Sequence, residues 1–517
     1  MWDREESLGL RGQHGFLLAE ILDSNSQNGP SWRYRVAKPL EVRLAERALP
    51  GESLAGNRPR SFVMTFAFGD LGKFQGQQGH VVEGRHALTV PPSVGLSATL
   101  SARLPLVAEQ PVEWDVAVLG AGPAGLAAAY AAANAGARTV VLERSAHPRY
   151  KTCGGGLIGV SVEAASQISI PARDHIQVAT FTRDGEWGFT RRHRGGSLLA
   201  TVRREDFDAA LLRAAMDAGA VVVERSAARA IEQDGERVRV RLADGSTVTA
   251  HILIGADGSA GISARHVGVD VAQVDLGLEV ELPIPDAIQR SWRNRILLDW
   301  GPIPGSYGWV FPKGDVLTVG VIAPRGMGEQ TRRYLRRFVD RLGFASIVPV
   351  QDSGHLTRCR TSESPLRRGR VLVAGDAAGL LEPWTREGIS FALRSGALAG
   401  TVAAACAHRG RRELDHGLDQ YASAVRETLV PEMDAGKRIL TAFSRHPGVF
   451  HAAFATPLGW RAFVKLCRGE LAFSSIVDRL PVRAALSMLG PDERRGPVRP
   501  GQREPQPTRI AGRSPRR

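Results

Sequence analysis

A glycine-rich turn between an apolar strand and an alanine-rich helix is the feature of this chain that most restricts its fold. The segment DVAVLGAG has the pattern of a short buried strand, PAGLAAAYAAANAG that of a helix closed by Gly136, and RTVVLER that of a second strand. Together they make a β-turn-α-β unit of about 30 residues, the length of one mononucleotide-binding half. The sequence therefore predicts an α/β protein with a Rossmann-type domain that opens at Trp114.

The turn has the GxGxxG spacing, and each of its glycines has a physical task. Gly120 permits the tight turn, Gly122 lets a pyrophosphate approach the backbone, and Gly125 lets helix and strand pack closely. The helix N-terminus offers free N–H groups to the phosphates, and Glu143, at the end of the second strand, can accept hydrogen bonds from a ribose. The predicted dinucleotide contacts also include Pro123, Ala124 and Arg144.

Charge does not indicate a nucleic-acid partner, although the formal net charge is +14 at pH 7. The segment from Asp492 to Arg517 holds eight arginines against three acids among prolines and glycines, so much of the excess lies in a solvated tail. The 57 glycines and 43% hydrophobic residues instead suit an α/β enzyme with many tight loops. We expect no nucleic acid among its partners.

Cysteine spacing and hydropathy indicate in which cellular compartment we expect the protein. The four cysteines never form a CxxC pair, so we expect no metal site and no disulfide framework, and a reducing cytoplasm is the simplest setting. The N-terminus lacks a signal-peptide pattern, and no stretch reaches the roughly 18 uninterrupted apolar residues of a membrane span. The expected location is the cytoplasm, with contact at the inner face of the membrane left open.

The pattern divides the chain into three parts. Residues 1–112 resemble linker more than core, and we interpret them as a poorly structured extension produced by a start codon assigned too far upstream. Residues 113–490 form the enzyme body, and residues 491–517 a basic disordered tail. Within the body we expect cofactor-binding parts at about 113–165, 200–270 and 360–410, an antiparallel substrate-binding sheet at about 166–199 and 271–359, and C-terminal helices at about 411–490.

A second motif, VLVAGDAAGLLEPWTREGI, has an apolar strand that runs into Gly375-Asp376 and a helix that begins near Glu387. This layout resembles the GD motif of glutathione-reductase-like flavoproteins, which include aromatic hydroxylases and geranylgeranyl reductases. The resemblance implies FAD, with Asp376 on the ribityl chain and the helix dipole directed at the flavin pyrimidine edge. It places Gly375, Glu387, Gly388 and Ile389 at the cofactor.

Between these motifs, HILIGADGSAGISAR resembles the DG motif of the same superfamily, with Asp257 and Gly258 at its turn. The family favours Ser and Arg where this chain has Gly261 and Ala264. The segment RREDFDAALLRAAMDAGA matches the family's RxxFD helix, and the resemblance places Arg203 at the cofactor.

Two further segments resemble the geranylgeranyl reductases in particular, over roughly residues 115–488. The loop KTCGGGL matches their cysteine-glycine loop, which implies that Cys153 and Gly154 lie near the isoalloxazine ring. The segment from Pro304 to Gly320 matches their PxxYxWxFPK pattern. Its alternation puts three aromatic rings on one face of a strand, which either lines a cavity for an apolar chain or is buried in core. The predicted substrate-binding residues are Tyr307, Trp309, Phe311 and Trp384.

The resemblance implies saturation of isoprenoid double bonds, in a geranylgeranyl lipid or the side chain of menaquinone, by hydride from reduced flavin. Cys153 and Tyr307 are the candidate catalytic acids, and packing of Cys153 on the ring is the alternative for that residue. Rival functions are an aromatic-type FAD monooxygenase and a flavoprotein that carries electrons to a quinone pool. The cysteines have no iron–sulfur spacing, which disfavours the latter.

Several questions stay open at this level. No second GxGxxG follows a strand, so NAD(P)H and ferredoxin are both candidate reductants. Residues 443–489 are rich in Phe and Arg and fit either helices docked peripherally on an anionic membrane or a lid over the site. Family members commonly have glycine where Arg386 stands, close to the expected flavin, so the exact substrate is undetermined.

Overall fold

The computed structural model describes residues 113–489 and six short strands before them. The chain separates into two compact units, Met1–Glu109 and Gln110–Arg517. In the first unit, β1, β4, β5 and β6 form one sheet and β2 pairs with β3. Otherwise the proposed N-terminal extension and basic tail lie outside the described residues. The bounds of the six strands are β1 (Ser7–Gly9), β2 (Leu18–Ile21), β3 (Trp32–Arg35), β4 (Glu41–Ala45), β5 (Val63–Phe66) and β6 (Ala87–Leu88).

The first sheet of the second unit has the order β14-β8-β7-β17-β16-β15, and β24 also pairs with β17 and with β23. Its centre is parallel: β7 pairs in parallel with β8 and β17, and β17 with β24. Strands β8 and β24 are fully buried, and so are the C-terminal ends of β7 and β17, as expected when helices cover both faces. The strands are β7 (Glu113–Leu119), β8 (Thr139–Leu142), β14 (Val221–Val223), β15 (Ala228–Gln233), β16 (Val238–Leu242), β17 (Thr247–Gly255), β23 (Arg367–Arg368) and β24 (Val371–Val373).

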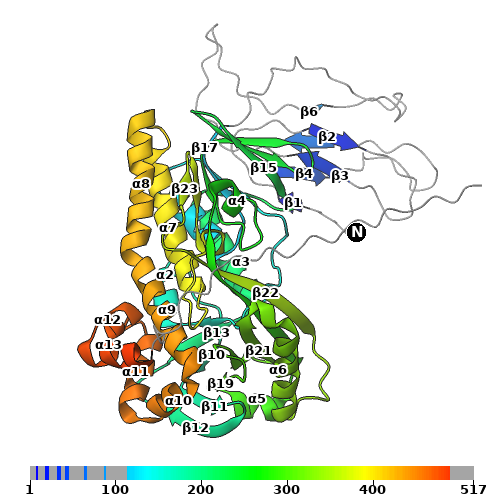
Figure 1. The fold of residues 1–517 in the computed structure, drawn as a ribbon. Helices are drawn as coiled ribbons and strands as arrows, with labels where there is room; N and C mark the ends of the chain where they lie inside the picture. Colours follow the sequence, from blue (N-terminus) through cyan, green and yellow to red (C-terminus); the bar gives the residue numbers. More distant parts are fainter. Residues whose placement is uncertain are drawn as a thin grey trace, which may run out of the picture. The chain divides into compact units, whose positions relative to one another are not determined.

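Helix α1 (Pro123–Asn134) packs against α7 (Ile389–Cys406) and α3 (Arg204–Asp217). The contact with α7 depends on small residues: a Cβ at Gly396 would lie 2.1 Å from the Ala124 carbonyl oxygen, and one at Gly400 would lie 2.2 Å from that of Ala128. Figure 1 shows α7 beside α8 (Arg411–Thr428) along one side of the body. Close packing of α1 on α7 thus fixes both helix N-termini relative to the first sheet.

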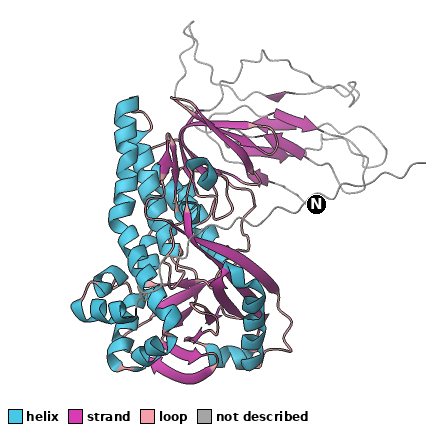
Figure 2. Ribbon diagram, in the orientation of Figure 1, coloured by secondary structure: helices cyan, strands magenta, loops and turns pink. Residues whose placement is uncertain are grey.

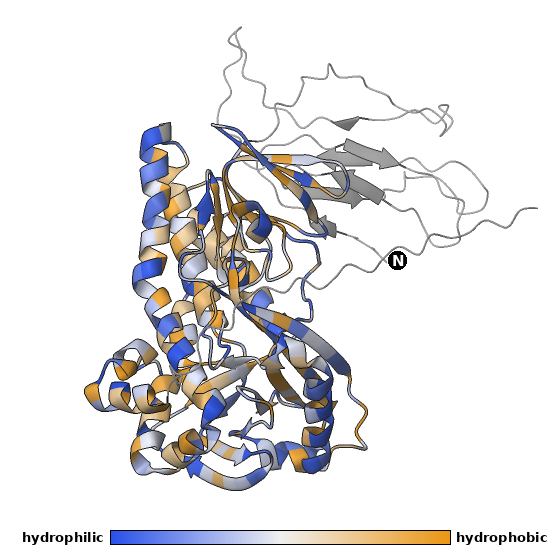
Figure 3. Cartoon of the chain, in the orientation of Figure 1, coloured by the Kyte–Doolittle hydropathy of each residue, from blue (hydrophilic) through white to orange (hydrophobic). Residues whose placement is uncertain are grey.

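The second sheet is seven-stranded, in the order β12-β11-β19-β20-β21-β18-β22. Helix α6 (Gly328–Arg341) covers one of its faces with Tyr334, Leu335 and Phe338 and turns a hydrophilic face outward (Figure 3). A small three-stranded sheet has the order β10-β13-β9, and α2 follows β9 and precedes β10 in the chain. These strands are β9 (Gly156–Leu157), β10 (Ala172–Ile176), β11 (Val178–Arg183), β12 (Glu186–Arg192), β13 (Leu199–Val202), β18 (Val271–Pro283), β19 (Arg295–Trp300), β20 (Tyr307–Pro312), β21 (Val316–Pro324) and β22 (Gln351–Arg360).

The remaining helices are mostly C-terminal, and Figure 2 shows the C-terminal ones gathered at one end of the long helices. Rings from α9, α10 and α11 join an aromatic cluster with the second sheet. The helices are α2 (Gly159–Ala164), α4 (Ser263–Val267), α5 (Asp286–Trp292), α9 (Val430–Arg445), α10 (Pro447–Ala455), α11 (Pro457–Cys467), α12 (Phe473–Val477) and α13 (Leu480–Leu489), with 3₁₀ turns η1 (Arg325–Met327) and η2 (Gly375–Ala378).

The expected fold class is confirmed: a Rossmann-type α/β domain, an inserted antiparallel sheet and a C-terminal helical region. Among the described residues, one helix, α7, is long and apolar enough to cross a membrane, but 61% of its apolar window is buried inside the fold. Its packing against α1 and α8 is that of a core helix.

Candidate functional site

A cavity of about 1300 Å³ opens where the first sheet, the second sheet and the C-terminal helices meet. It collects most of the residues that the sequence singled out. Gly125, Gly375 and Arg203 are not among its lining residues. Those that line it are Gly120, Gly122, Pro123, Ala124, Glu143, Arg144, Cys153, Gly154, Asp257, Gly258, Tyr307, Trp309, Phe311, Asp376, Trp384, Glu387, Gly388 and Ile389.

The glycine turn has the geometry that a dinucleotide requires. Gly120 has a φ of +92°, and a Cβ there would lie 2.4 Å from the Ala256 carbonyl oxygen. A Cβ at Gly125 would lie 1.8 Å from the Gly120 carbonyl oxygen, so only glycine permits this approach of helix to strand. A Cβ at Gly122 would meet only Arg149 Nη2, at an ordinary contact distance of 3.7 Å, and helix α1 has no side-chain cap. The first turn of α1 therefore presents uncapped backbone N–H groups to the cavity, as an anion site needs.

Glu143 is buried, and both of its oxygens hold the backbone around it. Oε2 accepts from the Ala121 N–H at 2.7 Å and Oε1 from the Ser145 N–H at 2.9 Å. Each carboxylate oxygen has a further lone pair, so Glu143 can also accept from a ligand hydroxyl. The acid at the end of β8 thus orders the glycine turn as well as lining the cavity.

Three cations near this turn were not recognised from the sequence. Arg149 donates to the Ala121 carbonyl at 3.1 Å, and Arg204 forms a bidentate pair with Asp208 at 2.9 Å. Lys151 is largely enclosed, and burial lowers its pKa although the charge of Asp376 opposes that shift. All three cations line the cavity and create positive potential for an anionic ligand. Arg203, the predicted contact, pairs with Asp315 instead.

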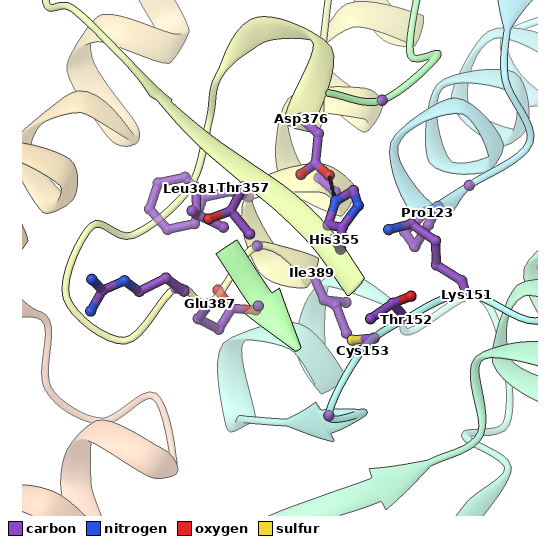
Figure 4. Close-up of a pocket in the computed structure, with 18 of the residues that line it drawn as sticks. Pro123, Lys151, Thr152, Cys153, His355, Thr357, Asp376, Leu381, Glu387 and Ile389 are labelled. Atoms are coloured by element: carbon purple, nitrogen blue, oxygen red, sulfur yellow. Dashed lines mark hydrogen bonds and ion pairs between the residues drawn. The ribbon is translucent and has the colours of Figure 1, made fainter. Parts of the chain in front are cut away.

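Asp376 lies across the cavity from α1, where its Oδ2 is 3.4 Å from His355 Nε2 (Figure 4). Burial acts to raise its pKa, but the hydrogen bond to His355 and the charge of Lys151 lower it overall. Asp376 is therefore a carboxylate at neutral pH that can accept hydrogen bonds. Gly375 beside it has a φ of +56° and packs against α1, which accounts for its place outside the lining.

The Asp257 side chain stabilises the backbone of the turn that follows it. Its Oδ2 accepts from the N–H groups of Ile262 and Ser263 at 2.7 and 3.1 Å, which caps α4. A Cβ at Gly261 would lie 2.0 Å from the Asp257 carboxyl carbon. The glycine that departs from the family pattern thus makes room for this rotamer.

The cysteine-glycine loop lies directly on the aromatic strand β20. A Cβ at Gly154 would be 3.0 Å from Trp309 Nε1, and one at Gly156 would be 2.9 Å from Phe311 Cε2. A Cβ at Gly320 would lie 2.1 Å from Trp309 Cζ2. The glycines of both family segments therefore accommodate the same two rings, and Cys153 lies beside Ile389 and Thr152 in Figure 4.

At the start of α7, the Glu387 carboxylate accepts from the Ser390 N–H at 2.8 Å and from Ser161 Oγ at 3.0 Å. It thus satisfies part of the first turn of α7, and Gly388 and Ile389 line the cavity beside it. This helix end can still interact with a ligand through the remaining N–H groups.

Arg386 has a buried partner. Its Nε and Nη2 lie 3.2 and 3.3 Å from the Asp275 carboxylate, and both side chains are 3% exposed. Its φ of +55° is left-handed, a conformation that glycine adopts without strain. This explains the glycine that the resembled family has here. The guanidinium also lies 5.8 Å from the Tyr307 ring centroid.

Aromatic rings line the other end of the cavity. Trp384 stacks on Phe454, with ring centroids 6.3 Å apart, and contacts Phe473 edge-on. The hydroxyl of Tyr307 donates to the Thr385 carbonyl, and burial raises its pKa, which makes it a poor acid. All three rings of β20 line the cavity, while Trp309 is 8% exposed and the rings of Tyr307 and Phe311 also pack against the second core cluster. Helices α10, α11 and α12 add wall residues Phe454, Phe463, Leu466, Cys467 and Phe473.

These features fit FAD. The uncapped start of α1, the uncrowded Gly122 beside Arg149 and the nearby cations suit a pyrophosphate, and the carboxylates Glu143 and Asp376 suit ribose and ribityl hydroxyls. A family model, the FAD binding domain, matches residues 113–281. FAD is therefore the cofactor of this protein.

Comparison with known proteins identifies two groups of reductases to which the chain is similar. It is 31% identical over 311 residues to a menaquinone reductase of Mycobacterium tuberculosis, covering 56% of this chain and 76% of that protein. It is 32% identical over 327 residues to digeranylgeranylglycerophospholipid reductase 1 of Methanopyrus kandleri, covering 56% and 80%.

Solved structures agree on the fold. A geranylgeranyl bacteriochlorophyll reductase-like protein of Thermoplasma acidophilum aligns with a TM-score of 0.60 at 21% identity, over 73% of this chain and 99% of that one. A flavin-dependent brominase aligns with a TM-score of 0.57 at 16% identity, over 73% and 99%. With the motifs and the relatives above, these findings show that the chain belongs to the geranylgeranyl reductase family of FAD-dependent oxidoreductases.

Proposed function

We propose that this protein saturates carbon–carbon double bonds of an isoprenoid chain, in a geranylgeranyl lipid or the side chain of menaquinone. One observation carries the proposal: a single cavity runs from the glycine turn at α1 to the aromatic rings of the C-terminal helices. It joins a dinucleotide site to an apolar compartment. The names of the relatives, a menaquinone reductase and digeranylgeranylglycerophospholipid reductases, support the same substrate class.

When bound and reduced, FAD supplies a hydride for one carbon of the double bond. The residues of the chain bind and orient the two reactants. Gly122 and the start of α1 bind the pyrophosphate, Glu143 the ribose and Asp376 the ribityl chain. Gly258, Gly388 and Ile389 also line the cavity and would contact the flavin.

The aromatic compartment binds the isoprenoid chain by burying its methylene and methyl groups. Trp309, Phe311 and Trp384 lie between the cysteine-glycine loop and the rings of α10 to α12. An isolated alkene is unreactive, so its rate depends on close placement and on exclusion of water. A wall of rings serves both needs.

Cys153 and Tyr307 have different tasks in this scheme. Cys153 belongs to the loop that packs on Trp309 and lines the cavity, where we expect its thiol to contact the flavin or the substrate. Tyr307 donates its hydroxyl to the Thr385 carbonyl, so it positions the loop that carries Arg386. Tyr307 also lines the cavity, so part of its ring would contact the substrate.

The electron donor is NAD(P)H or ferredoxin, bound transiently at the cofactor edge. We further propose peripheral contact with the inner face of the membrane, since the substrates are lipids. The C-terminal helices carry exposed apolar side chains suited to such contact: Val449, Leu458, Leu480 and Met488 are 50%, 77%, 71% and 85% exposed.

An anaerobic reaction tests the function. Purified protein is reduced with dithionite and mixed with geranylgeranyl diphosphate or menaquinone, while flavin absorbance and product mass are followed. Gain of a hydrogen pair per double bond, coupled to flavin reoxidation, is the expected result, and a fully saturated analogue of equal length should give no reoxidation. Reoxidation by oxygen alone, with hydroxylation of an aromatic compound, would identify a monooxygenase instead.

A further inference from the structure

A buried acid, Glu279, lies at the cavity without a role in the scheme above. The sheet register pairs Trp309 with Gly320, Gly320 with Glu279, and Glu279 with Ser353. Residues directly opposite in antiparallel strands project from the same face. Trp309, Glu279 and Ser353 all line the cavity, so this row crosses its wall. Gly320, which has no side chain, leaves room for the indole beside Glu279.

The two oxygens of Glu279 are in different situations. Oε1 accepts from the Cys153 N–H at 2.7 Å and from the Tyr150 hydroxyl at 2.9 Å. Oε2 is buried and has no hydrogen-bond partner among the described residues, while the residue as a whole is 1% exposed. Native structures rarely leave a buried polar atom unsatisfied, so Oε2 needs an explanation, and a catalytic role is one that fits its place at the cavity.

The surroundings favour the neutral acid. Burial raises the pKa of Glu279, the charge of Lys313 and the hydrogen bonds from Cys153 and Tyr150 oppose this, and Glu281 adds to it. Lys313 Nζ lies 3.0 Å from Glu281 Oε1, so its charge is already paired. Because Oε1 already accepts two hydrogen bonds, Oε2 is the oxygen that can carry the proton.

A hydrogen-bonded path leads from Glu279 toward the surface. The Tyr150 hydroxyl lies 3.0 Å from Ser353 Oγ, which also accepts from Thr152 Oγ1 at 3.0 Å. Ser353 is half-buried between the exposed residues Asp352 and Gly354 on β22. A protein site that excludes water needs such a path if it consumes a proton in every turnover.

We propose that Glu279 is the acid that protonates the substrate alkene and that Ser353 and Tyr150 return a proton to it from solvent. The inference rests on the proposed function. The Oε2–H bond breaks, and the π electron pair forms a C–H bond to that proton. The other carbon would receive the hydride that bound, reduced FAD would supply. Tyr150 then passes its hydroxyl proton to Glu279 Oε1, its hydrogen-bond acceptor, and takes one from Ser353, which is refilled from water. Rotation of the carboxyl group brings the proton back to the side of the alkene.

Single-turnover kinetics test the acid. Reduced protein is mixed anaerobically with geranylgeranyl diphosphate, and flavin oxidation and product are followed. Glu279→Gln should slow this step by about 10²–10⁴-fold, the usual contribution of a general acid. Asp352→Asn, which removes a carboxylate from an exposed position, is the matched control and should match wild type. Tyr150→Phe should complete its first turnover at the wild-type rate and slow only in later turnovers.

Infrared difference spectra of wild type against Glu279→Gln add a readout that does not depend on turnover. A carbonyl band of a protonated carboxylic acid, present at pH 7 in wild type alone, supports the inference. Absence of this band would overturn the assignment. An unchanged rate of the first turnover in Glu279→Gln would also overturn it. So would a result in which Cys153→Ser loses the first turnover and Glu279→Gln keeps it. If Glu279→Gln does not retain FAD, two other measurements test the inference: the fast first turnover with slow later turnovers in Tyr150→Phe, and a pH titration of the infrared band in wild type. If none of the isoprenoids tested reoxidises the reduced flavin of the wild-type protein, the proposed function itself is refuted.

Discussion

The buried pair of Arg386 and Asp275 gives a sharp prediction of stability. Asp275→Asn removes the charged partner of a guanidinium that is 3% exposed and that also donates to the Trp384 carbonyl at 2.7 Å and lies over the Tyr307 ring. Removal of one partner of a buried pair costs about 3–5 kcal/mol. Over the roughly 380 residues of the body, an unfolding entropy of about 2 cal/mol/K per residue converts this cost into a Tm lowered by about 4–6 °C.

The matched variant is Arg386→Gly. It also breaks the pair, but glycine relieves about 1 kcal/mol of left-handed strain, and Asp275 keeps its hydrogen bond from Gln273 at 2.6 Å. We therefore expect a smaller loss than for Asp275→Asn. The double variant buries no charge at this place and should recover most of the stability.

The assay is thermal and urea unfolding at saturating FAD, with the flavin-to-protein ratio measured for each variant so that cofactor loss is separated from lost pairing. A coupling energy of at least about 2 kcal/mol between the two sites is expected. Strict additivity of the single effects, or a Tm for Asp275→Asn within 1 °C or so of wild type, would refute the reasoning.

Three further predictions concern the cofactor and substrate compartments. Gly125→Ala should abolish FAD retention, because the added Cβ would lie 1.8 Å from the Gly120 carbonyl oxygen; the flavin absorbance of the purified variant checks this. The lowered pKa of Asp376 stabilises the fold above its unfolded pKa of about 4, and this is lost as pH falls through the folded pKa. Asp376→Asn should therefore flatten the acid side of a plot of urea midpoint against pH, and an unchanged slope would contradict the assignment. Trp384→Ala should cost about 3–5 kcal/mol in urea unfolding and raise KM more for a long than for a short isoprenoid, and an equal KM change for both would contradict a chain-binding role.

Secondary structure was predicted correctly where a local sequence pattern has a single physical meaning. The glycine spacing and apolar strands around Gly120 predicted β7, α1 and β8, and the alternation from Tyr307 to Phe311 predicted a strand with one aromatic face. In both cases backbone geometry alone determines which side chains share a face.

Contacts between distant segments could not be predicted in this way. Arg149, Lys151 and Arg204 meet at the cavity only because the β8–α2 connection and α3 lie next to each other in the fold. Glu279 had a weak signal: acids recur at every second or fourth position of an otherwise apolar strand, at 275, 279 and 281. That pattern marks one polar face, but only the sheet register shows that the face opens onto the cavity.

The fold itself does not separate a reductase from a monooxygenase or a halogenase, since a brominase aligns almost as well as the reductase-like protein. The distinction must come from the wall of the cavity. A monooxygenase needs room for oxygen and a polar contact for its aromatic substrate, whereas alkene reduction needs an apolar compartment and a supply of protons. Here the glycine loop is pressed against Trp309 and Phe311, the far end is lined with rings, and the buried carboxyl with a path to the surface is Glu279. These local features favour the reductase, and loss of proton delivery in Glu279→Gln with intact FAD binding would separate the two chemistries directly.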